Sequence, residues 1–357
     1  MGEPMRVGVV GAGNISHQYF RTLSTLSSTE VVAVSDRDLS RAVAAVETVP
    51  GARAIPLDEL LAADDIDLVL NLTTPEAHAD VALAALASGK HVYGEKPLAA
   101  RPAEGAAVVE AAEKAGLRVG CAPDTVLGTG IQTARKIVED GMIGAPTSAT
   151  AVMACFGHER WHPDPEFYYR PGGGPLLDMG PYYLSALVHL LGPVKSVTGV
   201  GSRPRPTRTI ANGPRAGTTF QTDVDTHITG LLEHENGALT SLIMSFDMAA
   251  TRSSNIEVHG TAGSLIVPDP NKFDGECTLR RPGEADWSAV PPSAGFAEAG
   301  RGSGLAEMAQ AIAEGRPHRA SADLAYHVLD CAYTLLESAA QRTTLDVKSR
   351  CEVPPLV

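Results

Sequence analysis

The chain has 357 residues, a formal net charge of −13 and a pI near 5.3. This acidic balance argues against a nucleic-acid partner or an anionic membrane surface, because both require clustered lysines and arginines. The length exceeds what a single core comfortably organises, so we expect two domains, residues 1–123 and 124–357. A hydrophobic content of 44% supplies enough apolar mass for two cores.

The cysteines and the N-terminus give no sign of secretion or metal binding. The five cysteines are scattered, with no C-x-x-C pair and no histidine at ligand spacing, so we expect neither a disulfide framework nor a metal site. The first apolar run lacks the flanks of a signal peptide, and no apolar run approaches 18 residues. We therefore expect a cytoplasmic protein with no membrane segment.

The N-terminal stretch has the order strand, glycine turn, helix. A β-branched strand, Arg6–Val10, runs directly into Gly11, and Gly13 follows two residues later. Gly11 permits the tight turn, and Gly13 lets the backbone approach a pyrophosphate at the positive end of a helix that begins near Asn14. Ser16 stands where the fingerprint has a third glycine, and its small side chain still allows close helix packing. The turn residues expected to contact a dinucleotide are Gly11, Gly13, Asn14, Ile15 and Ser16.

A second strand, Val31–Ser35, ends in Asp36, about 20 residues beyond the glycines. A carboxylate at this position accepts hydrogen bonds from an adenosine ribose and repels a 2′-phosphate, which favours NAD. Arg37 leaves NADP as an alternative, because a guanidinium beside the ribose pairs with that phosphate or stacks on adenine.

Strands and helices alternate up to Cys121, and two strand ends carry further candidate cofactor contacts. The apolar strand Ile66–Leu72 leads through a hydroxyl and proline helix entry, where the expected contacts are Leu72, Thr73, Thr74, Pro75 and His78. His78 is either a cofactor contact or a solvated or capping side chain. The strand His91–Tyr93 runs into another group of expected contacts, Glu95, Lys96 and Pro97.

Lys96 is the first candidate for chemistry. A lysine after a strand is usually a solvated surface cation, but at the carboxyl end of a parallel strand it lies where open α/β sheets bind ligands. There its ammonium would polarise a substrate oxygen and lower the pKa of a neighbouring acid–base group. Pro97 stiffens the chain after it.

From Thr147 onward β-rich runs joined by turns predict one larger antiparallel or mixed sheet, interrupted by helices at Thr129–Asp140 and Leu177–Leu191. The stretches 204–215 and 282–301 are rich in Pro, Gly and Ser and are expected to be surface loops. The first is basic, with Arg203, Arg205, Arg208 and Arg215. It is either a solvated loop, the reading we favour, or a site for a phosphorylated ligand or partner.

A triple glycine, residues 172–174, precedes a second candidate group. On a helix beginning near Leu177, Asp178 and Tyr182 are four residues apart and point to the same side. The alternative is a helix N-terminal carboxylate beside a core tyrosine. The preceding loop is expected to form a wall of a substrate pocket through His158, Trp161 and His162, with Trp161 offering a face for a sugar ring.

Four motifs together resemble the family of glucose-fructose oxidoreductase and inositol dehydrogenase (Gfo/Idh/MocA): GAGNIS, NLTTPEAH, GEKP and GGGPLLDMG. The resemblance extends from Arg6 to about Ala340. It implies an α/β fold, with an N-terminal Rossmann doubly wound parallel sheet and a C-terminal α/β domain with a large open, mostly antiparallel sheet. It also implies oxidation or reduction of sugars, inositols and related polyols with NAD or NADP, and a homo-oligomer formed through the C-terminal sheet.

By position, Lys96 matches the family's catalytic lysine and Asp178 the aspartate of its D-x-x-x-H motif. Tyr182 stands where many members have the histidine that acts as general base. A tyrosine of ordinary pKa near 10 is a poor base at neutral pH, but a nearby ammonium such as Lys96 would lower that pKa. His158 and His162 remain as substitutes for the missing histidine.

The leading hypothesis is a dehydrogenase or reductase that transfers a hydride between nicotinamide and a secondary alcohol or ketone of a sugar, inositol or polyol, with Lys96, Asp178 and Tyr182 as the catalytic set. Two alternatives are a hydrolase or lyase that retains its NAD and oxidises the sugar transiently, and a non-catalytic dinucleotide-binding regulator. Retention of Lys96 and Asp178 counts against the regulator, which has no use for proton-transfer groups.

Overall fold

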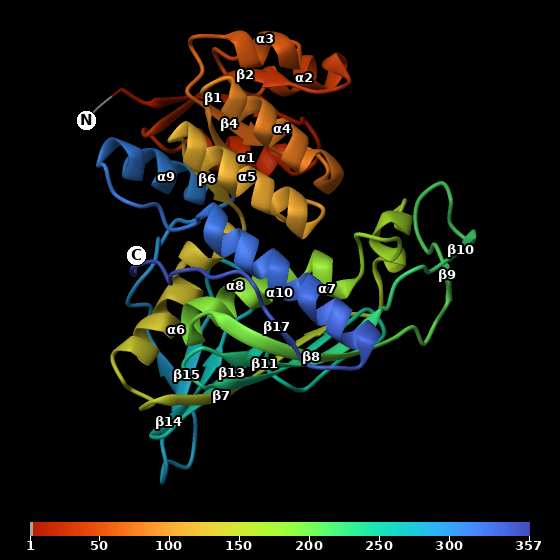
Figure 1. Cartoon of the computed structure of the whole chain (residues 1–357), viewed down its shortest axis with the longest axis vertical. Helices are drawn as coiled ribbons and strands as arrows, with labels where there is room; N and C mark the ends of the chain where they lie inside the picture. Colours follow the sequence, from red (N-terminus) through yellow and green to blue (C-terminus); the bar gives the residue numbers. More distant parts are fainter. Residues whose placement is uncertain (1–2) are drawn as a thin grey trace. The chain divides into compact units, whose positions relative to one another are not determined.

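The computed structural model describes residues 3–357, which form two compact units (Figure 1). The first unit runs to residue 128 and also contains residues 296–326, and the second comprises 129–295 and 327–357. The sequence-based division at residue 123 differs from this, because it leaves 296–326 in the second domain. The reason is a long-range pairing at the strand β6 Val119–Cys121, where Cys121 N donates to Ala320 O at 3.0 Å and Gly120 forms an antiparallel bridge with Ser321.

The first unit contains a six-stranded parallel sheet in the order β3-β2-β1-β4-β5-β6. This is the strand order of a doubly wound dinucleotide-binding fold, which confirms the predicted Rossmann sheet. Its strands are β1 Met5–Val10, β2 Thr29–Ser35, β3 Arg53–Ala54, β4 Leu68–Asn71, β5 His91–Gly94 and β6 Val119–Cys121.

The helices of the first unit are α1 Ser16–Leu23, α2 Leu39–Val46, α3 Leu57–Ala62, α4 Pro75–Ala87, α5 Pro102–Ala115 and α9 Ser303–Ala313, with a 3-10 turn, η1, at Asp124–Leu127. Helices α4 and α5 lie side by side (Figure 1). Helices α1, α2 and α9 share one apolar cluster with β1, β2 and β4, in which Tyr19, Leu305 and Met308 are fully buried. The late segment therefore completes the core of the first unit.

The second unit contains a nine-stranded sheet in the order β16-β15-β14-β13-β7-β12-β11-β8-β17. Within the described chain its ladders are antiparallel except that between β7 and β12, which confirms the mostly antiparallel sheet expected. Its strands are β7 Pro146–Ala154, β8 Val194–Ser202, β11 His227–His234, β12 Leu239–Ser245, β13 Ile256–Gly260, β14 Gly263–Val267, β15 Cys277–Arg280, β16 Ser288–Val290 and β17 Leu345–Asp346.

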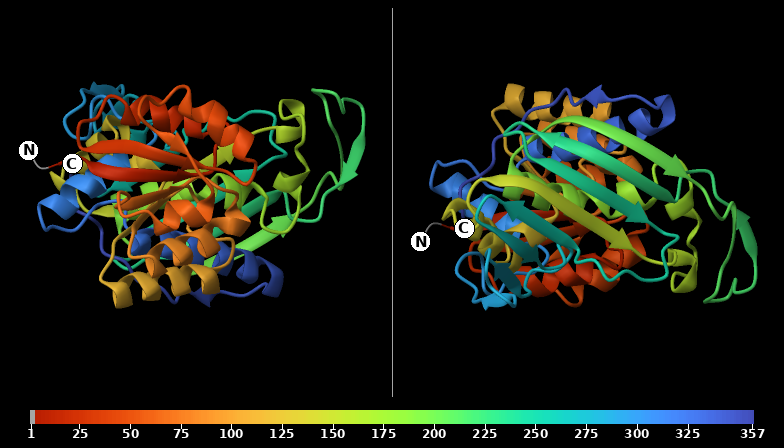
Figure 2. Two further views of the ribbon diagram at one scale, coloured as in Figure 1. Left: turned by 90° about the horizontal axis from the view of Figure 1, so that it is seen from above. Right: turned by 90° about the horizontal axis from the view of Figure 1, so that it is seen from below.

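A separate two-stranded hairpin of β9 Thr207–Thr209 and β10 Thr219–Gln221 projects beyond the edge of this sheet (Figure 2). The expectation that residues 204–215 and 282–301 form surface loops is therefore wrong in part, because β9 lies within the first stretch and β16 within the second. The cross-strand pairs join Thr209 to Thr219 and Thr207 to Gln221. Threonine favours strands because its branched side chain fits the pleated surface.

The helices α6 Thr129–Glu139, α8 Gly180–Leu191 and the later part of α10 Ala322–Gln341 cover one face of the nine-stranded sheet (Figure 1). The view from below shows the other face without a covering helix among the described elements of this unit (Figure 2). Every residue of α8 is buried, so this helix forms the centre of the core. No helix within residues 3–357 combines the length and apolarity needed to span a membrane.

The predicted helix from Leu177 to Leu191 is in fact two helices, which corrects the prediction. The short helix α7, Pro175–Asp178, ends before Met179, and α8 begins at Gly180 with Pro181 in its first turn. Proline lacks a backbone N–H and is therefore favoured where a helix starts, not within one.

Candidate active site

The glycine turn after β1 has the geometry that a dinucleotide requires. Gly11 has a φ of +104°, and a Cβ at this position would lie 2.6 Å from the carbonyl oxygen of Leu72. Any side chain at residue 11 would therefore strain the turn and collide with the end of β4. A Cβ at Gly13 would meet no atom within 4 Å, so the backbone there borders open space that a ligand can approach.

Ser16 begins α1, two residues later than predicted. Its side chain is fully buried, and its hydroxyl donates to the carbonyl of Gly13 at 2.7 Å. Ser16 stands where the fingerprint has its third glycine, and its hydrogen bond links the start of the helix to the turn. Asn14 is exposed and Ile15 half-buried ahead of the helix, whose positive dipole end favours a phosphate.

Asp36 joins the end of β2 to the glycine turn. Its Oδ2 accepts from the backbone N–H of Ala12 at 2.8 Å, and its Oδ1 accepts from that of Asp38 at 2.9 Å. A carboxylate has about four lone-pair sites, so these two bonds leave acceptor capacity for a ribose. Arg37 is exposed beside it. The turn, the buried serine and the half-buried acid together fit an NAD-type dinucleotide.

The residues after β4 form the helix entry that the sequence predicts. Thr74 is the N-cap residue of α4 and Pro75 is its first helical residue. Thr73 donates its hydroxyl to the side-chain oxygen of Asn71 at 2.6 Å. His78 is only 3% exposed, and its Nδ1 and Nε2 lie 2.6 Å from the carbonyl of Pro97 and 3.1 Å from that of Thr73. The imidazole therefore links the two loops after β4 and β5 and is not a solvated side chain.

The backbone of Lys96 is held by the preceding glutamate. Glu95 is 9% exposed, and its Oε1 accepts from the hydroxyl of Tyr19 at 2.9 Å while its Oε2 accepts from the N–H of Lys96 at 3.0 Å. Close by in the same unit, Tyr93 donates its hydroxyl to Asp124, and both are buried. Burial raises the pKa of Asp124 and of Tyr93. The sequence gives no signal for Asp124, because only the fold brings it to β5.

In the second unit the structure brings together two of the predicted residues, His158 and Asp178. The Nε2 of His158 lies 2.8 Å from the Oδ2 of Asp178, and the indole N–H of Trp161 donates to His158 Nδ1 at 3.2 Å. An indole nitrogen is a donor only, so Nδ1 is the acceptor and the neutral ring carries its proton on Nε2, facing the carboxylate. This is the arrangement of an oriented base, in which the carboxylate fixes the tautomer.

Aromatic rings surround this pair. The His158 ring centroid lies 4.4 Å from those of Tyr168 and Phe246 and 5.2 Å from that of Trp161. Trp161 is 54% exposed, so much of its ring remains open to solvent. The predicted pocket residue His162 lies beside it, at 5.3 Å between ring centroids. The structure thus places the rings of His158, Trp161 and His162 next to one another.

Tyr182 does not share a helix with Asp178, so the single helix on which we expected both residues does not form. Asp178 ends α7, whereas Tyr182 is in the first turn of α8 and is 5% exposed. The helix is interrupted at Met179, so the two residues belong to successive helices.

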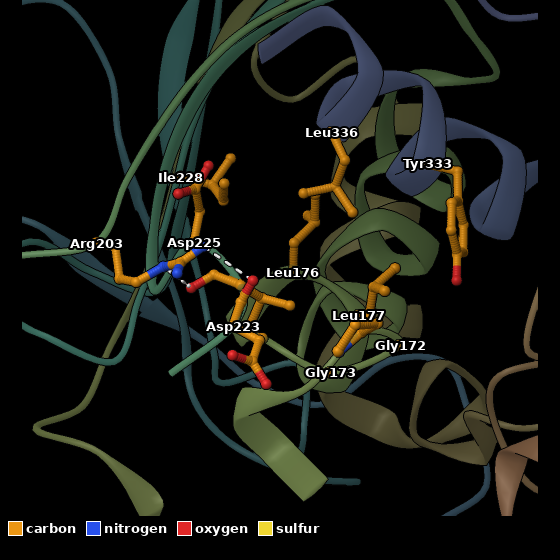
Figure 3. Close-up of a pocket in the computed structure, with 13 residues that line it drawn as sticks. Gly172, Gly173, Leu176, Leu177, Arg203, Asp223, Asp225, Ile228, Tyr333 and Leu336 are labelled. Atoms are coloured by element: carbon orange, nitrogen blue, oxygen red, sulfur yellow. Dashed lines mark hydrogen bonds between the residues drawn. The ribbon is translucent and has the colours of Figure 1, made fainter. Parts of the chain in front are cut away.

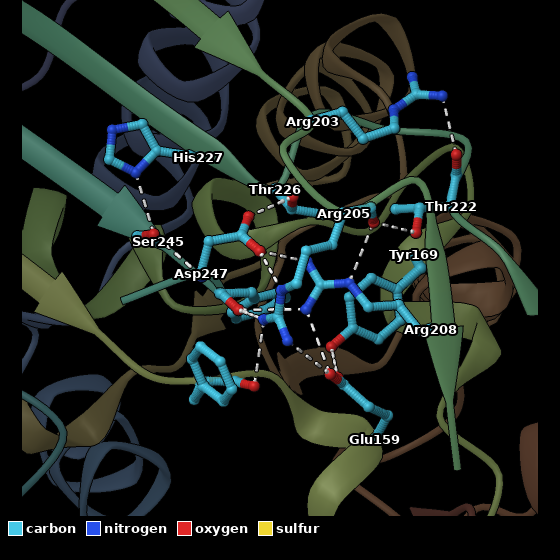
Figure 4. Close-up of polar contacts among 12 residues, drawn as sticks. Glu159, Tyr169, Arg203, Arg205, Arg208, Thr222, Thr226, His227, Ser245 and Asp247 are labelled. Carbon is cyan, nitrogen blue, oxygen red and sulfur yellow. Dashed lines mark hydrogen bonds and ion pairs between the residues drawn. The ribbon is translucent and has the colours of Figure 1, made fainter. Parts of the chain in front are cut away.

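A buried ion-pair network supports the loop that carries His158 (Figure 4). The side chain of Arg208 is 1% exposed, and its guanidinium lies 3.2 Å from Glu159 and 2.7 Å from Asp247. Tyr169 donates its hydroxyl to Glu159 and accepts from the backbone N–H of His158 at 2.9 Å. The expectation of a solvated basic loop is therefore wrong for Arg208.

The other arginines of the loop are also engaged by the chain itself. Arg205 lies 2.8 Å from Asp247, and Arg215, which is more exposed, pairs with Glu166 on η3 Glu166–Tyr169. Sequence reasoning missed Glu159 and Asp247 as partners, because the three segments involved lie far apart in the chain.

Residues 5–122 match the model of an oxidoreductase family with an NAD-binding Rossmann fold, and residues 131–266 match the GFO/IDH/MocA C-terminal domain. The dTDP-3,4-didehydro-2,6-dideoxy-alpha-D-glucose 3-reductase of Streptomyces antibioticus is 30% identical over 82% of this chain and 85% of its own length. Inositol 2-dehydrogenase 3 of Saccharopolyspora erythraea is 30% identical over 74% of each chain.

A solved structure of levoglucosan dehydrogenase with NADH and L-sorbose has the same fold, with a TM-score of 0.82 over 97% of this chain and 99% of that one at 22% identity. The reductase match spans most of both sequences, and two family models match residues 5–122 and 131–266. The chain therefore belongs to the Gfo/Idh/MocA family of NAD-binding oxidoreductases.

Proposed function

We propose that the protein transfers a hydride between a nicotinamide cofactor and a secondary alcohol or ketone of a sugar, inositol or related polyol. The observation that carries the proposal is the pair of His158 and Asp178, in which a carboxylate 2.8 Å from Nε2 leaves Nδ1 as the basic atom. The relatives named above act on a dideoxyglucose derivative and on inositol, which supports a polyhydroxylated substrate.

Each residue has a defined task in this proposal. The bound nicotinamide accepts or donates the hydride. In the oxidation direction, His158 Nδ1 takes the proton of the substrate hydroxyl, and the carboxylate of Asp178 stabilises the imidazolium that forms. For Lys96 we keep the role that the family resemblance implies, a cation that stabilises negative charge on a substrate oxygen. In the reduction direction His158 returns the proton.

We assign the proton transfer to His158 in preference to Tyr182. Tyr182 lies in the first turn of α8 and is 5% exposed. His158 is near a carboxylate that orients it, and its ring is 12% exposed. The loop histidine thus takes the place of the histidine that many family members carry at the position of Tyr182.

Trp161 supports a sugar-like substrate. Its 54% exposed ring lies beside the basic atom, and an aromatic face packs well against the C–H face of a sugar ring. The N–H of Trp161 occupies Nδ1 in this structure, so a substrate hydroxyl must replace it before proton transfer begins.

Turnover of the cofactor with a library of sugars, inositols and polyols tests the proposal. We expect a substrate-dependent change in nicotinamide absorbance that is lost in His158→Ala and Lys96→Met, while cofactor affinity stays within a few fold in both variants. Tyr182→Phe is the matched control and should remain active. A substrate that is consumed without net cofactor change would instead identify an NAD-retaining hydrolase or lyase, and binding without any consumption would identify a regulator.

We also propose that the protein is a homo-oligomer formed through the uncovered face of the nine-stranded sheet. The cross-strand pairs Val200–Thr229 and Leu239–Glu233 place Val200 and Leu239 on the same face as Leu231. These three side chains are 48%, 57% and 58% exposed. Analytical ultracentrifugation should find an oligomer that Leu231→Asp dissociates, and a wild-type monomer would refute the proposal.

A further inference from the structure

The second unit contains a pocket of about 340 Å³ that neither His158 nor Asp178 lines. It lies between the triple-glycine loop, the neighbouring ends of β8 and β11, and helix α10. Arg203, Asp225 and Ile228 stand on one side of it, and Tyr333 and Leu336 of α10 stand on the other (Figure 3). A volume of this order accommodates a small organic molecule.

The glycine loop gives the pocket a preformed wall. Gly174 has a φ of +90°, and a Cβ at Gly173 would lie 2.6 Å from the carbonyl oxygen of Phe167. The N–H groups of Gly173 and Gly174 donate to the carbonyls of Arg170 and Tyr168 at 2.8 and 2.7 Å. The loop is therefore fixed by its own backbone bonds, and a ligand would find the wall in place.

The positively charged side chain of the pocket, Arg203, is hydrogen-bonded to the protein backbone. The guanidinium of Arg203 donates through three nitrogens to the carbonyls of Thr222, Asp223 and Val224 at 2.7, 2.8 and 3.0 Å. These bonds hold the segment before β11 in place as the second wall. Because three of its five N–H donors are used in this way, Arg203 is a weaker phosphate ligand than a guanidinium with all donors available.

The two carboxylates that line the pocket are not bound to other groups in this way. Asp225 is half-buried and Asp223 is exposed, and neither carboxylate takes part in a hydrogen bond or ion pair within residues 3–357. The lining thus carries two negative side chains and one positive side chain that is bound to backbone carbonyls. Its free polar atoms on Asp223 and Asp225 are acceptors, which call for a ligand with donors and positive charge.

The rest of the lining is apolar. Leu176 and Ile228 are each 1% exposed at the floor, and Leu177 and Leu336 are half-buried at the sides. Such walls stabilise a hydrocarbon body by removing it from water. A free sugar would gain less from these walls, because most of its surface carries hydroxyl groups.

We propose that this pocket binds a small organic ammonium compound with an apolar body, separately from the sugar site. The ammonium pairs with the carboxylate of Asp225, and the body lies between Leu177, Ile228 and Leu336. Binding here is independent of the proposed reaction, because neither His158 nor Asp178 lines the pocket.

Titration calorimetry of the full chain with benzylamine and benzyl alcohol, without cofactor or sugar, tests the proposal. These probes share one body and differ in charge at neutral pH. We expect benzylamine to bind and benzyl alcohol to bind about tenfold more weakly, because a charge-assisted hydrogen bond is lost. Equal affinity for the two probes, or no binding of benzylamine, would overturn the proposal.

Three variants locate the binding. Asp225→Asn keeps the shape of the side chain and should weaken benzylamine about tenfold, and Leu336→Trp should fill the pocket and abolish binding. Asp58→Asn, at an exposed position on α3, changes the net charge by the same amount and should leave the affinity unchanged. Circular dichroism confirms that each variant is folded. If Asp225→Asn binds benzylamine as tightly as Asp58→Asn does, the ammonium site is elsewhere and the assignment is wrong.

Discussion

Replacing Asp178 by asparagine removes one charge from the proposed base and keeps its shape. In the structure the Oδ2 of Asp178 lies 2.8 Å from His158 Nε2, and the two side chains are 16% and 12% exposed, so solvent screens the pair only in part. A hydrogen bond to a charged group contributes about 1.5–3 kcal/mol, which corresponds to a rate loss of about 10- to 150-fold when the imidazolium forms.

A change in the tautomer of His158 would add to this loss of rate. If the asparagine NH₂ turns toward Nε2, the ring proton must move to Nδ1, where the indole N–H of Trp161 already donates. Two donors would then face each other, and Nδ1 would no longer accept a proton from the substrate. We therefore expect Asp178→Asn to lower kcat by about 10²- to 10³-fold, within the range of general acid–base catalysis.

Initial rates of nicotinamide absorbance change measure kcat, and cofactor fluorescence measures binding, which should stay within a few fold. Nitrogen-15 NMR of the histidine rings provides a readout independent of turnover, because it distinguishes an Nε2-protonated His158 from an Nδ1-protonated one. Tyr182→Phe is the control and should keep kcat within about threefold. A fully active Asp178→Asn, or a Tyr182→Phe enzyme with a hundredfold loss, would return the proton transfer to the phenol and refute the reasoning.

Gly13→Ala should weaken NADH binding and leave the melting temperature unchanged, because the new Cβ enters the open space beside the turn. Gly11→Ala should lower the melting temperature, because its Cβ would collide with Leu72. Equal effects of the two variants on the melting temperature would contradict this geometry. NADH should bind more tightly than NADPH by fluorescence titration, since Asp36 would repel a 2′-phosphate, and a tenfold preference for NADPH would sink this expectation. Burial lowers the pKa of His189 to about 3, below the ordinary value near 6.5. Protonation of His189 therefore favours the unfolded chain, so the free energy of unfolding should fall as the pH is lowered from about 6.5 to 3. In urea titrations, His189→Leu should make this fall shallower by up to about 1.4 kcal/mol per pH unit. If the wild type and the variant lose stability with the same slope, His189 is not the cause.

Local patterns in the sequence predict much of the first unit. The strand, the glycine turn and the acid at the end of β2 are close in the chain, so their spacing alone defines the turn. Helix α5 also has local signals at both ends, since Pro102 marks its start and Gly116, at a φ of +64°, ends it. These features depend on contacts between residues a few positions apart.

The pairing of the proposed base, His158, with Asp178 could not be predicted from the sequence. The family pattern directs attention to Tyr182, but the dipeptide Gly180-Pro181 is itself a helix-start signal that would have predicted the break before α8. The proximity of His158 to Asp178 depends on a loop whose position is set by the buried pairs of Arg208 with Glu159 and Asp247. No local pattern encodes a contact between segments so distant in the chain.

The first unit is assembled from two segments that are far apart in the polypeptide, one ending at residue 128 and the other comprising residues 296–326, and this affects its folding during synthesis. When a ribosome has produced residues up to 128, the strands β1 to β6 exist, but Leu305 and Met308, which complete the apolar cluster around α1, have not been synthesised. The partner of Cys121 N is Ala320, about 200 residues later. Part of the apolar surface of the N-terminal sheet therefore stays uncovered while residues 129–295 are synthesised. Its final stability is gained only near the end of translation, so a chain cut after residue 295 would retain the glycine turn and still lack a finished core.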